Sequence, residues 1–245
     1  MAQAIARYLP KDRHLDILEV GAGTSPGQYV THRSLFHGID HSYVGVDVRP
    51  GAHVDRVMPR PYSIPARSRS ADVIVAGSVL EHVPFFWASM LEIARVMRPR
   101  ALLFVTVPSR GHKHSDLDCW RMYPDGMRAL AAASRLTLLD VHTHFPPRLR
   151  NDGNRHNYRR IRTDDYWGDT VAVFRKPRRY APSMRLVRPA VRWWANRASR
   201  SGPLDPAWER PPSRCRVFTD AGNRPWEEAL AEGAPAAPER PVGTH

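Results

Sequence analysis

Short runs of β-branched and other apolar residues alternate with helix-forming stretches through the first 178 residues of the chain. This alternation is typical of an α/β protein with a largely parallel sheet. Apolar residues recur at helical spacing in Phe85–Arg98, and Pro124 precedes a second helical stretch, Asp125–Ser134. Six runs are predicted to be strands: Leu15–Val20, Tyr43–Asp47, Asp72–Ala76, Ala101–Val107, Leu136–His142 and Thr170–Phe174.

The composition changes after Pro177. Residues 179–245 are rich in Pro, Arg and Ala and show little alternation of apolar and polar positions. The last stretch, from Glu232 to His245, has the composition of a disordered segment. We therefore predict one domain over residues 1–178 and a partly disordered C-terminal extension over residues 179–245.

Composition limits the classes of protein to which this chain can belong. Only two cysteines, Cys119 and Cys215, occur in 245 residues, too few for a disulfide framework or a cysteine-based zinc site. No apolar run approaches the roughly 18 residues that a membrane span needs, and Arg7 interrupts the apolar start, unlike a secretory signal. We expect a cytoplasmic protein.

The chain carries a formal net charge of +13, and only three of its 37 basic residues are lysine. An excess of arginine together with 23 prolines is consistent with a genome-wide compositional bias. A basic chain also favours anionic partners such as phosphates, nucleotides or a membrane face. Composition alone leaves both interpretations open.

A glycine-rich turn follows the first predicted strand. Gly21 and Gly23 allow the backbone to approach a ligand closely, although the third glycine of the dinucleotide fingerprint is absent from its usual place. Glu19 precedes the turn, and its carboxylate suits a cationic or hydroxyl-bearing ligand and would repel a pyrophosphate. The second strand ends in Asp47, where an acid can accept both hydroxyls of a ribose. Together these residues favour a ligand site over a purely structural turn.

Five motifs occur in order along the chain: Glu19-Val-Gly-Ala-Gly23, Gly45-Val-Asp47, Asp72-Val-Ile-Val75, Ser78-Val-Leu-Glu-His-Val83 and Arg98-Pro99. This set resembles class I S-adenosylmethionine-dependent methyltransferases, and most of all their type 11 subgroup. The resemblance covers about residues 13–178. It implies a Rossmann-like seven-stranded, mostly parallel sheet with helices on both faces, and S-adenosylmethionine as the cofactor.

The resemblance implies cofactor contacts from three places along the chain. The glycine-rich turn would lie under the methionine portion, the end of the second strand would hold the ribose, and the start of the Ser-Val-Leu-Glu-His-Val motif would line the floor beneath the sulfonium. The corresponding residues are Glu19, Gly21, Ala22 and Gly23 in the first place, Asp47 and Val48 in the second, and Ser78 and Val79 in the third.

One departure from the family pattern concerns the adenine. Where the family often carries an Asp followed by a small residue, this chain has Arg60-Pro61. Arginine cannot accept a hydrogen bond and proline has no N–H to donate. We therefore expect the adenine either to be held by a neighbour such as Tyr62 or to be held weakly.

The segment Pro108–Gly126 follows the fourth predicted strand and gathers histidines, acids and aromatic residues. It resembles a His…Asp-x-Trp-Arg-x-x-Pro-x-Gly segment of bacterial methyltransferases that accompany glycan assembly. His114 or Asp118 is a candidate to take a proton from an acceptor hydroxyl, since such loops place ligands in parallel sheets. Alternatively, Trp120 and Arg121 anchor the loop and the histidines are solvated. Imidazole and carboxylate groups also suit a metal, but no second pair completes a site, and we predict none.

His82 allows two interpretations. It lies just past the predicted sulfonium floor, where an imidazole can act as a general base near neutral pH. It can equally cap the helix that follows. We keep it as a catalytic candidate beside His114 and Asp118.

Two basic segments remain. Arginines crowd residues 148–162, where they can grip a phosphate, bind RNA or form a solvated insertion. The stretch Ser183–Ser201 combines tryptophans with arginines and contains no acid, the composition of a helix at a membrane surface. The alternative for this stretch is a helix packed on the domain.

The sequence thus predicts an enzyme that methylates an oxygen of a small-molecule, glycan or lipid-linked acceptor. Two alternatives are an RNA methyltransferase and a methyltransferase-like binding protein that has lost catalysis. A nucleic-acid partner is disfavoured, because no Asn/Asp-Pro-Pro-Tyr/Phe type motif follows Ala76 and no added RNA-binding domain is evident.

Overall fold

The computed structural model describes residues 1–10, 12–24, 31–111, 117–143, 168–200, 216–219 and 222–225. The chain divides into two compact units, Met1–Arg200 and Ser201–His245. Within the second unit, strands β8 (Arg216–Thr219) and β9 (Gly222–Pro225) form an antiparallel pair. The elements that bear on function belong to the first unit.

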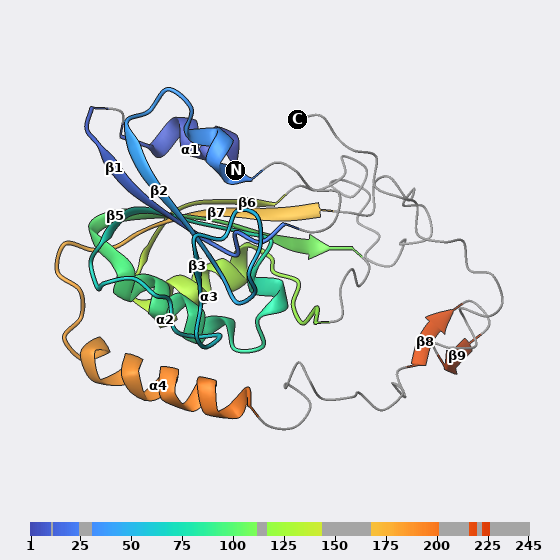
Figure 1. Cartoon of the computed structure of the whole chain (residues 1–245). Helices are drawn as coiled ribbons and strands as arrows, with labels where there is room; N and C mark the ends of the chain where they lie inside the picture. Colours follow the sequence, from blue (N-terminus) through green and yellow to red (C-terminus); the bar gives the residue numbers. More distant parts are fainter. Residues whose placement is uncertain are drawn as a thin grey trace. The chain divides into compact units, whose positions relative to one another are not determined.

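A seven-stranded sheet with the order β3-β2-β1-β4-β5-β7-β6 forms the centre of the first unit (Figure 1). β7 runs antiparallel to both its neighbours and the other pairs are parallel, which confirms the predicted sheet. The sequence missed only the two-residue edge strand β3. The strands are β1 (Leu15–Val20), β2 (His41–Asp47), β3 (Arg56–Val57), β4 (Ala71–Gly77), β5 (Met97–Arg110), β6 (Thr137–Thr143) and β7 (Gly168–Arg175).

Helices cover both faces of this sheet (Figure 1). The short helix α1 (Ala2–Tyr8) packs on one face with Ile17 and Val73, and α2 (Phe86–Val96) and α3 (Pro124–Ser134) pack on the other with Leu18 and Ile74. Successive strand residues point to opposite faces, so two buried faces explain the nearly continuous apolar runs. Helix α2 ends at Val96, two residues before the predicted end, because Met97 pairs with Ala71 as the start of β5.

Helix α4 (Met184–Ala198) packs against α2. Its Ala195 is fully buried in a cluster with Tyr62 and Ala88, and the side-chain oxygen of Asn196 accepts a hydrogen bond from the Tyr62 N–H at 3.3 Å. The compact unit therefore continues past the boundary predicted near residue 178 to Arg200. Independent folding of residues 1–178 stays a prediction.

The strand order determines where ligand-binding turns gather. β2, β1 and β4 are neighbours and parallel, so the turns that follow Asp47, Val20 and Gly77 meet at one edge of the sheet. Open parallel sheets bind their ligands at such an edge, outside the carboxyl ends of the strands.

Candidate functional site

The glycine-rich turn closes tightly on the segment that follows β4. Gly21 has a φ of 79°, and its N–H donates a hydrogen bond to the Val46 carbonyl at 2.8 Å. A Cβ atom at this position would lie 2.1 Å from Cγ2 of Val79. Gly21 is therefore required twice, once by its left-handed backbone and once by the space available. Ala22 follows as a buried residue beneath the turn.

Asp47 is held by backbone groups at the end of β2. Its Oδ2 accepts a hydrogen bond from the Gly23 N–H at 2.9 Å, and its Oδ1 accepts one from the Arg49 N–H at 3.1 Å. A carboxylate oxygen has two lone pairs, so each oxygen keeps one acceptor position for a ligand. Two such acceptors suit the adjacent hydroxyls of a ribose. Val48, half-exposed beside them, adds an apolar contact surface.

Glu19 is buried at the end of β1 and is gripped by two side chains. Its Oε1 lies 2.6 Å from Nδ1 of His32, and its Oε2 accepts a hydrogen bond from the Tyr43 hydroxyl at 2.9 Å. Burial, with the Glu19 charge next in importance, raises the pKa of Tyr43. The tyrosine therefore remains a neutral donor that holds the carboxylate in place.

His32 also covers the end of β4. A Cβ atom at Gly77 would lie 2.4 Å from Cε1 of the His32 ring. The imidazole thus lies against the ends of both β1 and β4. His32 is the first residue of the short 3₁₀ helix η1 (His32–Phe36). Sequence reasoning missed His32 and Tyr43, because neither belongs to a motif and only the fold brings them to Glu19.

Ser78 shapes the floor of the site. This exposed residue has a φ of 52°, and its N–H donates to the Thr106 carbonyl at 2.9 Å. A left-handed conformation costs a residue other than glycine about 1 kcal/mol or more. The turn at Ser78 carries the chain into Val79, which meets Gly21. The structure therefore brings the predicted sulfonium floor to the glycine-rich turn.

The segment Pro108–Gly126, called the acceptor segment below, contacts the residues that follow Val79 directly. His82, on the 3₁₀ helix η2 (Leu80–His82), contacts the Leu117 carbonyl through Nδ1 at 2.7 Å. Three residues further on, the Trp120 indole N–H donates to the Val83 carbonyl at 3.1 Å. Trp120 is thus an anchor, as one of the two sequence interpretations holds. His114 lies outside the described residues.

Asp118 forms an ion pair within the acceptor segment. Its side chain is 1% exposed, and its two oxygens lie 2.6 and 2.8 Å from the two terminal nitrogens of Arg121. A bidentate guanidinium contact holds a carboxylate firmly in its charged form. This arrangement corresponds to loop anchoring rather than to the uptake of a proton from an acceptor.

Glu81 is the titratable group that the sequence argument overlooked. It is fully buried, and neither carboxylate oxygen has a hydrogen-bond partner in the described part of the chain. Burial is the largest cause that raises its pKa to about 7, and the nearby charge of Asp118 raises it further. Nε2 of His82 lies 3.7 Å from Oε1. Glu81 therefore titrates near neutral pH, next to the acceptor segment.

Tyr62 lies away from the surface of the site. It is 1% exposed, its ring packs on Phe85 with centroids 5.9 Å apart, and its hydroxyl accepts a hydrogen bond from the Phe85 N–H at 3.2 Å. The expected contact between this ring and an adenine is not available in this conformation. Arg60 and Pro61 are both exposed.

A family model described as "Methyltransferase domain" matches residues 1–146, more than half of the chain. The chain belongs to this methyltransferase family. The matched region contains every residue that the resemblance assigns to the cofactor. The protein is an S-adenosylmethionine-dependent methyltransferase, and S-adenosylmethionine is its cofactor. Both predictions from the motifs are confirmed.

Solved structures of similar fold come from several organisms. A putative sarcosine dimethylglycine methyltransferase from Galdieria sulphuraria superposes with a TM-score of 0.51 at 16% identity, over 73% of this chain and 84% of the other. A putative methyltransferase from Bacillus halodurans superposes with a TM-score of 0.54 at 11% identity, over 72% of this chain and 98% of the other.

A third solved structure contains bound ligands. It is a 1,6-didemethyltoxoflavin-N1-methyltransferase from Burkholderia thailandensis with bound 1,6-didemethyltoxoflavin and S-adenosylhomocysteine. Its TM-score is 0.52 at 16% identity, over 72% of this chain and 76% of the other. At such identities the likeness concerns the fold alone. No match is found among curated proteins.

The described residues contain neither a metal-binding cluster nor a candidate membrane span. No group of three or more His, Cys, Asp or Glu side chains there is arranged to hold a metal ion. No helix in the same part of the chain combines the length and the apolarity needed to span a bilayer.

Replacing Asp47 with alanine removes both acceptors for the ribose. We expect the affinities for S-adenosylmethionine and S-adenosylhomocysteine, measured by calorimetry, to fall by about 1–3 kcal/mol. Asp40→Ala serves as the control, because this exposed carboxylate pairs with His14 at the opposite ends of the strands. Equal affinities in Asp47→Ala and in the unchanged protein would show that Asp47 does not bind the ribose.

The raised pKa of Glu81 predicts a pH dependence of stability. A carboxyl with a pKa of about 7 when folded and about 4.5 when unfolded binds more protons in the folded state. Its contribution to the free energy of unfolding therefore falls as the pH rises from about 4.5 to 7, by about 3 kcal/mol. Glu81→Gln should lack this loss. Urea unfolding of both proteins at pH 5 and pH 8 measures it, and an identical pH dependence would contradict the assignment.

Proposed function

We propose that this methyltransferase methylates a hydroxyl oxygen of a small-molecule, glycan or lipid-linked acceptor, and that His82 is the general base. The position of His82 carries this proposal. It lies three residues after Val79, which contacts the cofactor turn, and it contacts the acceptor segment at Leu117.

The hydrogen bond to Leu117 selects the reactive nitrogen of His82. A carbonyl can only accept, so Nδ1 carries the hydrogen and Nε2 is the atom that takes up a proton. The side chain is 31% exposed. Oε1 of Glu81 lies 3.7 Å from Nε2. Glu81 thus acts through His82 and is a positioning residue.

The chain's own residues have three tasks in this reaction. The turn at Gly21 and the carboxylate of Asp47 hold the cofactor, which supplies an electrophilic methyl group when bound. The acceptor segment aligns the hydroxyl, and alignment contributes most of the rate enhancement in such a displacement. His82 removes the hydroxyl proton, a contribution of about 10²–10⁴-fold.

The substitution His82→Asn tests this role. Asparagine can still donate to the Leu117 carbonyl but cannot act as a base near pH 7. We expect turnover to fall by about 10²–10⁴-fold while the affinity for S-adenosylhomocysteine changes little. The assay is methyl transfer from S-adenosylmethionine to a panel of sugar, lipid-linked and phenolic hydroxyls, with RNA included.

The control is His37→Asn, at an exposed histidine outside the site. Unchanged turnover in His82→Asn would move the base to His114. Transfer to RNA alone would establish the first alternative function, and cofactor binding without transfer to any acceptor would establish the catalytically inactive binding protein.

A series of aromatic rings favours a lipid-linked acceptor within this class. Starting from Trp194 on α4, successive centroids lie 4.7 Å apart to Phe85, 5.7 Å to Trp87, 5.0 Å to Phe86 and 5.0 Å to Trp120. All five side chains are partly exposed. The series thus joins the outer surface of α4 to the acceptor segment, and it offers a long apolar chain a continuous contact surface.

We infer that α4 rests on an anionic membrane surface, peripheral to its cytoplasmic face. Its outward residues include Leu186, 79% exposed, Trp193, 66%, and Trp194, 46%. The helix carries four arginines and no acid. Tryptophan and leucine beside arginine is the chemistry of a helix that lies in the interface of an anionic bilayer. An enzyme held there meets lipid-linked acceptors directly.

Vesicle sedimentation tests this inference. We expect binding to vesicles that contain phosphatidylglycerol and much weaker binding to pure phosphatidylcholine. Leu186→Ser should weaken binding by about tenfold or more, because a buried leucine contributes about 1.5–3 kcal/mol. Val57→Ser, at a half-exposed valine on the edge strand β3, is the matched control. Failure to bind either vesicle, or equal effects of the two substitutions, would contradict it.

A further inference from the structure

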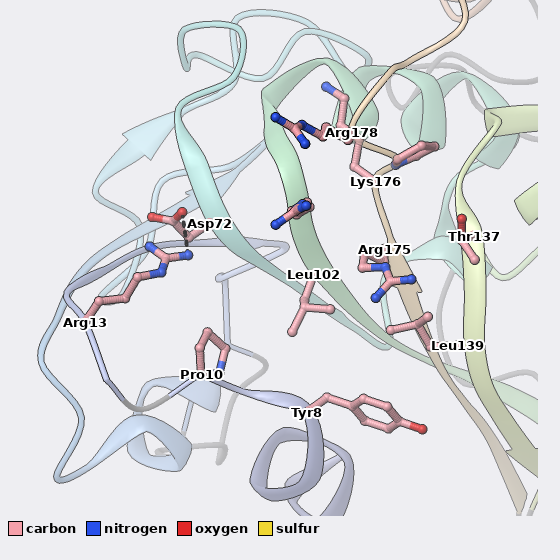
Figure 2. Close-up of a pocket in the computed structure, with 12 residues that line it drawn as sticks. Tyr8, Pro10, Arg13, Asp72, Leu102, Thr137, Leu139, Arg175, Lys176 and Arg178 are labelled. Carbon is pink, nitrogen blue, oxygen red and sulfur yellow. Dashed lines mark hydrogen bonds and ion pairs between the residues drawn. The ribbon is translucent and has the colours of Figure 1, made fainter.

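A cavity of about 630 Å³ opens at the edge of the sheet where the parallel strands begin (Figure 2). Its walls come from the starts of β4, β5 and β6, the end of β7 and the residues around the end of α1. The cofactor residues follow the carboxyl ends of β1, β2 and β4, so this cavity lies at the opposite edge. Its volume is in the range of pockets for small organic molecules.

The charges that line the cavity are nearly all positive. The only acid, Asp72, is neutralised by Arg13 at 3.0 Å and by Arg98. Lys176 points its ammonium at the end of α2, where it donates to the Ala94 and Met97 carbonyls at 2.6 and 2.7 Å.

Three further arginines remain at the cavity: Arg100, Arg175 and Arg178. All three are exposed. Their guanidinium groups have no hydrogen bond or ion pair with any residue that the structure describes. Guanidinium groups without a carboxylate partner create a positive potential that attracts an anion.

Strand pairing and a backbone hydrogen bond fix the main chain at two of these arginines, Arg175 and Arg100. Arg175 lies directly opposite Leu102 on β5 and directly opposite Thr137 on β6. Directly opposed residues share a face of the sheet, so Arg175 stands between two lining residues. The backbone N–H of Arg100 donates to the Lys176 carbonyl at 2.9 Å, which links the start of β5 to the end of β7.

The backbone at Arg100 is unusual. Its φ of 68° lies in the left-handed region that glycine adopts without cost. A residue with a side chain is strained at such a position. The chain nevertheless carries a guanidinium there, at the wall of the cavity. This cost is consistent with a role for the side chain in binding.

The remaining wall is apolar and aromatic. Leu102 and Leu139 rise from the sheet, and Tyr8 and Pro10 face them from the end of α1 (Figure 2). The Tyr8 hydroxyl donates to Asp140 at 3.2 Å, which ties α1 to β6. The cavity therefore places an apolar surface beside a group of cations.

We propose that this cavity binds a small phosphomonoester that carries an apolar or aromatic group. The phosphate pairs with Arg100, Arg175 and Arg178, since the planar fork of a guanidinium matches phosphate oxygens. The organic portion lies against Leu102 and Leu139. This site is separate from the methyl-transfer site and does not rest on the function proposed for it.

Phenyl phosphate is a suitable probe, with inorganic phosphate and phenol as its separate halves. We expect calorimetry to show saturable binding of phenyl phosphate, at least tenfold tighter than either half. Arg175→Gln should weaken it by about tenfold, the loss of one charge-assisted contact. Arg179→Gln is the matched control, because this exposed arginine lies outside the lining and loses the same charge.

Three outcomes would overturn the proposal. The first is the absence of saturable binding, and the second is equal weakening by Arg179→Gln, which would indicate an effect of net charge alone. The third is loss of phenyl phosphate binding in Asp47→Ala, which would place the probe in the cofactor site. Thermal melting of each variant checks that the fold is retained.

Discussion

The contact between Gly21 and Val79 is the constraint on which the site depends. The ends of β1 and β4 approach so closely that a single added carbon atom would meet Val79 at 2.1 Å. Two backbone features make the approach possible, a left-handed glycine on one side and a left-handed serine, Ser78, on the other. The same approach aligns the turn with Asp47, whose carboxylate the turn itself holds through Gly23. Backbone geometry therefore builds the turn that is predicted to hold the cofactor.

A second constraint joins the cradle to the acceptor side. The backbone N–H of Cys119 donates to the Glu81 carbonyl at 2.7 Å, between the contacts that His82 and Trp120 make with the same two segments. This pairing seals Glu81 from water and raises its pKa. A buried carboxyl without hydrogen bonds destabilises a fold, and such groups concentrate at functional sites. The destabilising burial of the Glu81 carboxyl is therefore evidence for a functional site at this position.

The first unit uses its two sheet edges and its outer helix for different purposes. The residues predicted to bind the cofactor and the acceptor lie at the carboxyl edge, and arginines lie around an apolar wall at the opposite edge. Helix α4 buries Ala195 and Asn196 against the domain while it exposes Leu186 and Trp193. High arginine content alone does not explain this distribution. The arginines at Asp72, Asp118 and Glu92 are paired, whereas Arg100, Arg175 and Arg178 at the cavity have no ion pair with any residue that the structure describes.

Local patterns in the sequence by themselves determined six of the seven strands of the sheet, the helices α2 and α3 and the cofactor motifs. These features depend on residues close together in the chain, and apolar periodicity or a glycine-rich turn reveals them directly. Only the tertiary structure decided which side chains contact one another. It brought His32 and Tyr43 to Glu19, buried Tyr62 beneath α4 and left Glu81 without a hydrogen-bond partner in the described part of the chain. Such contacts connect residues that no local pattern relates, because burial and charge pairing are settled only when distant segments pack together.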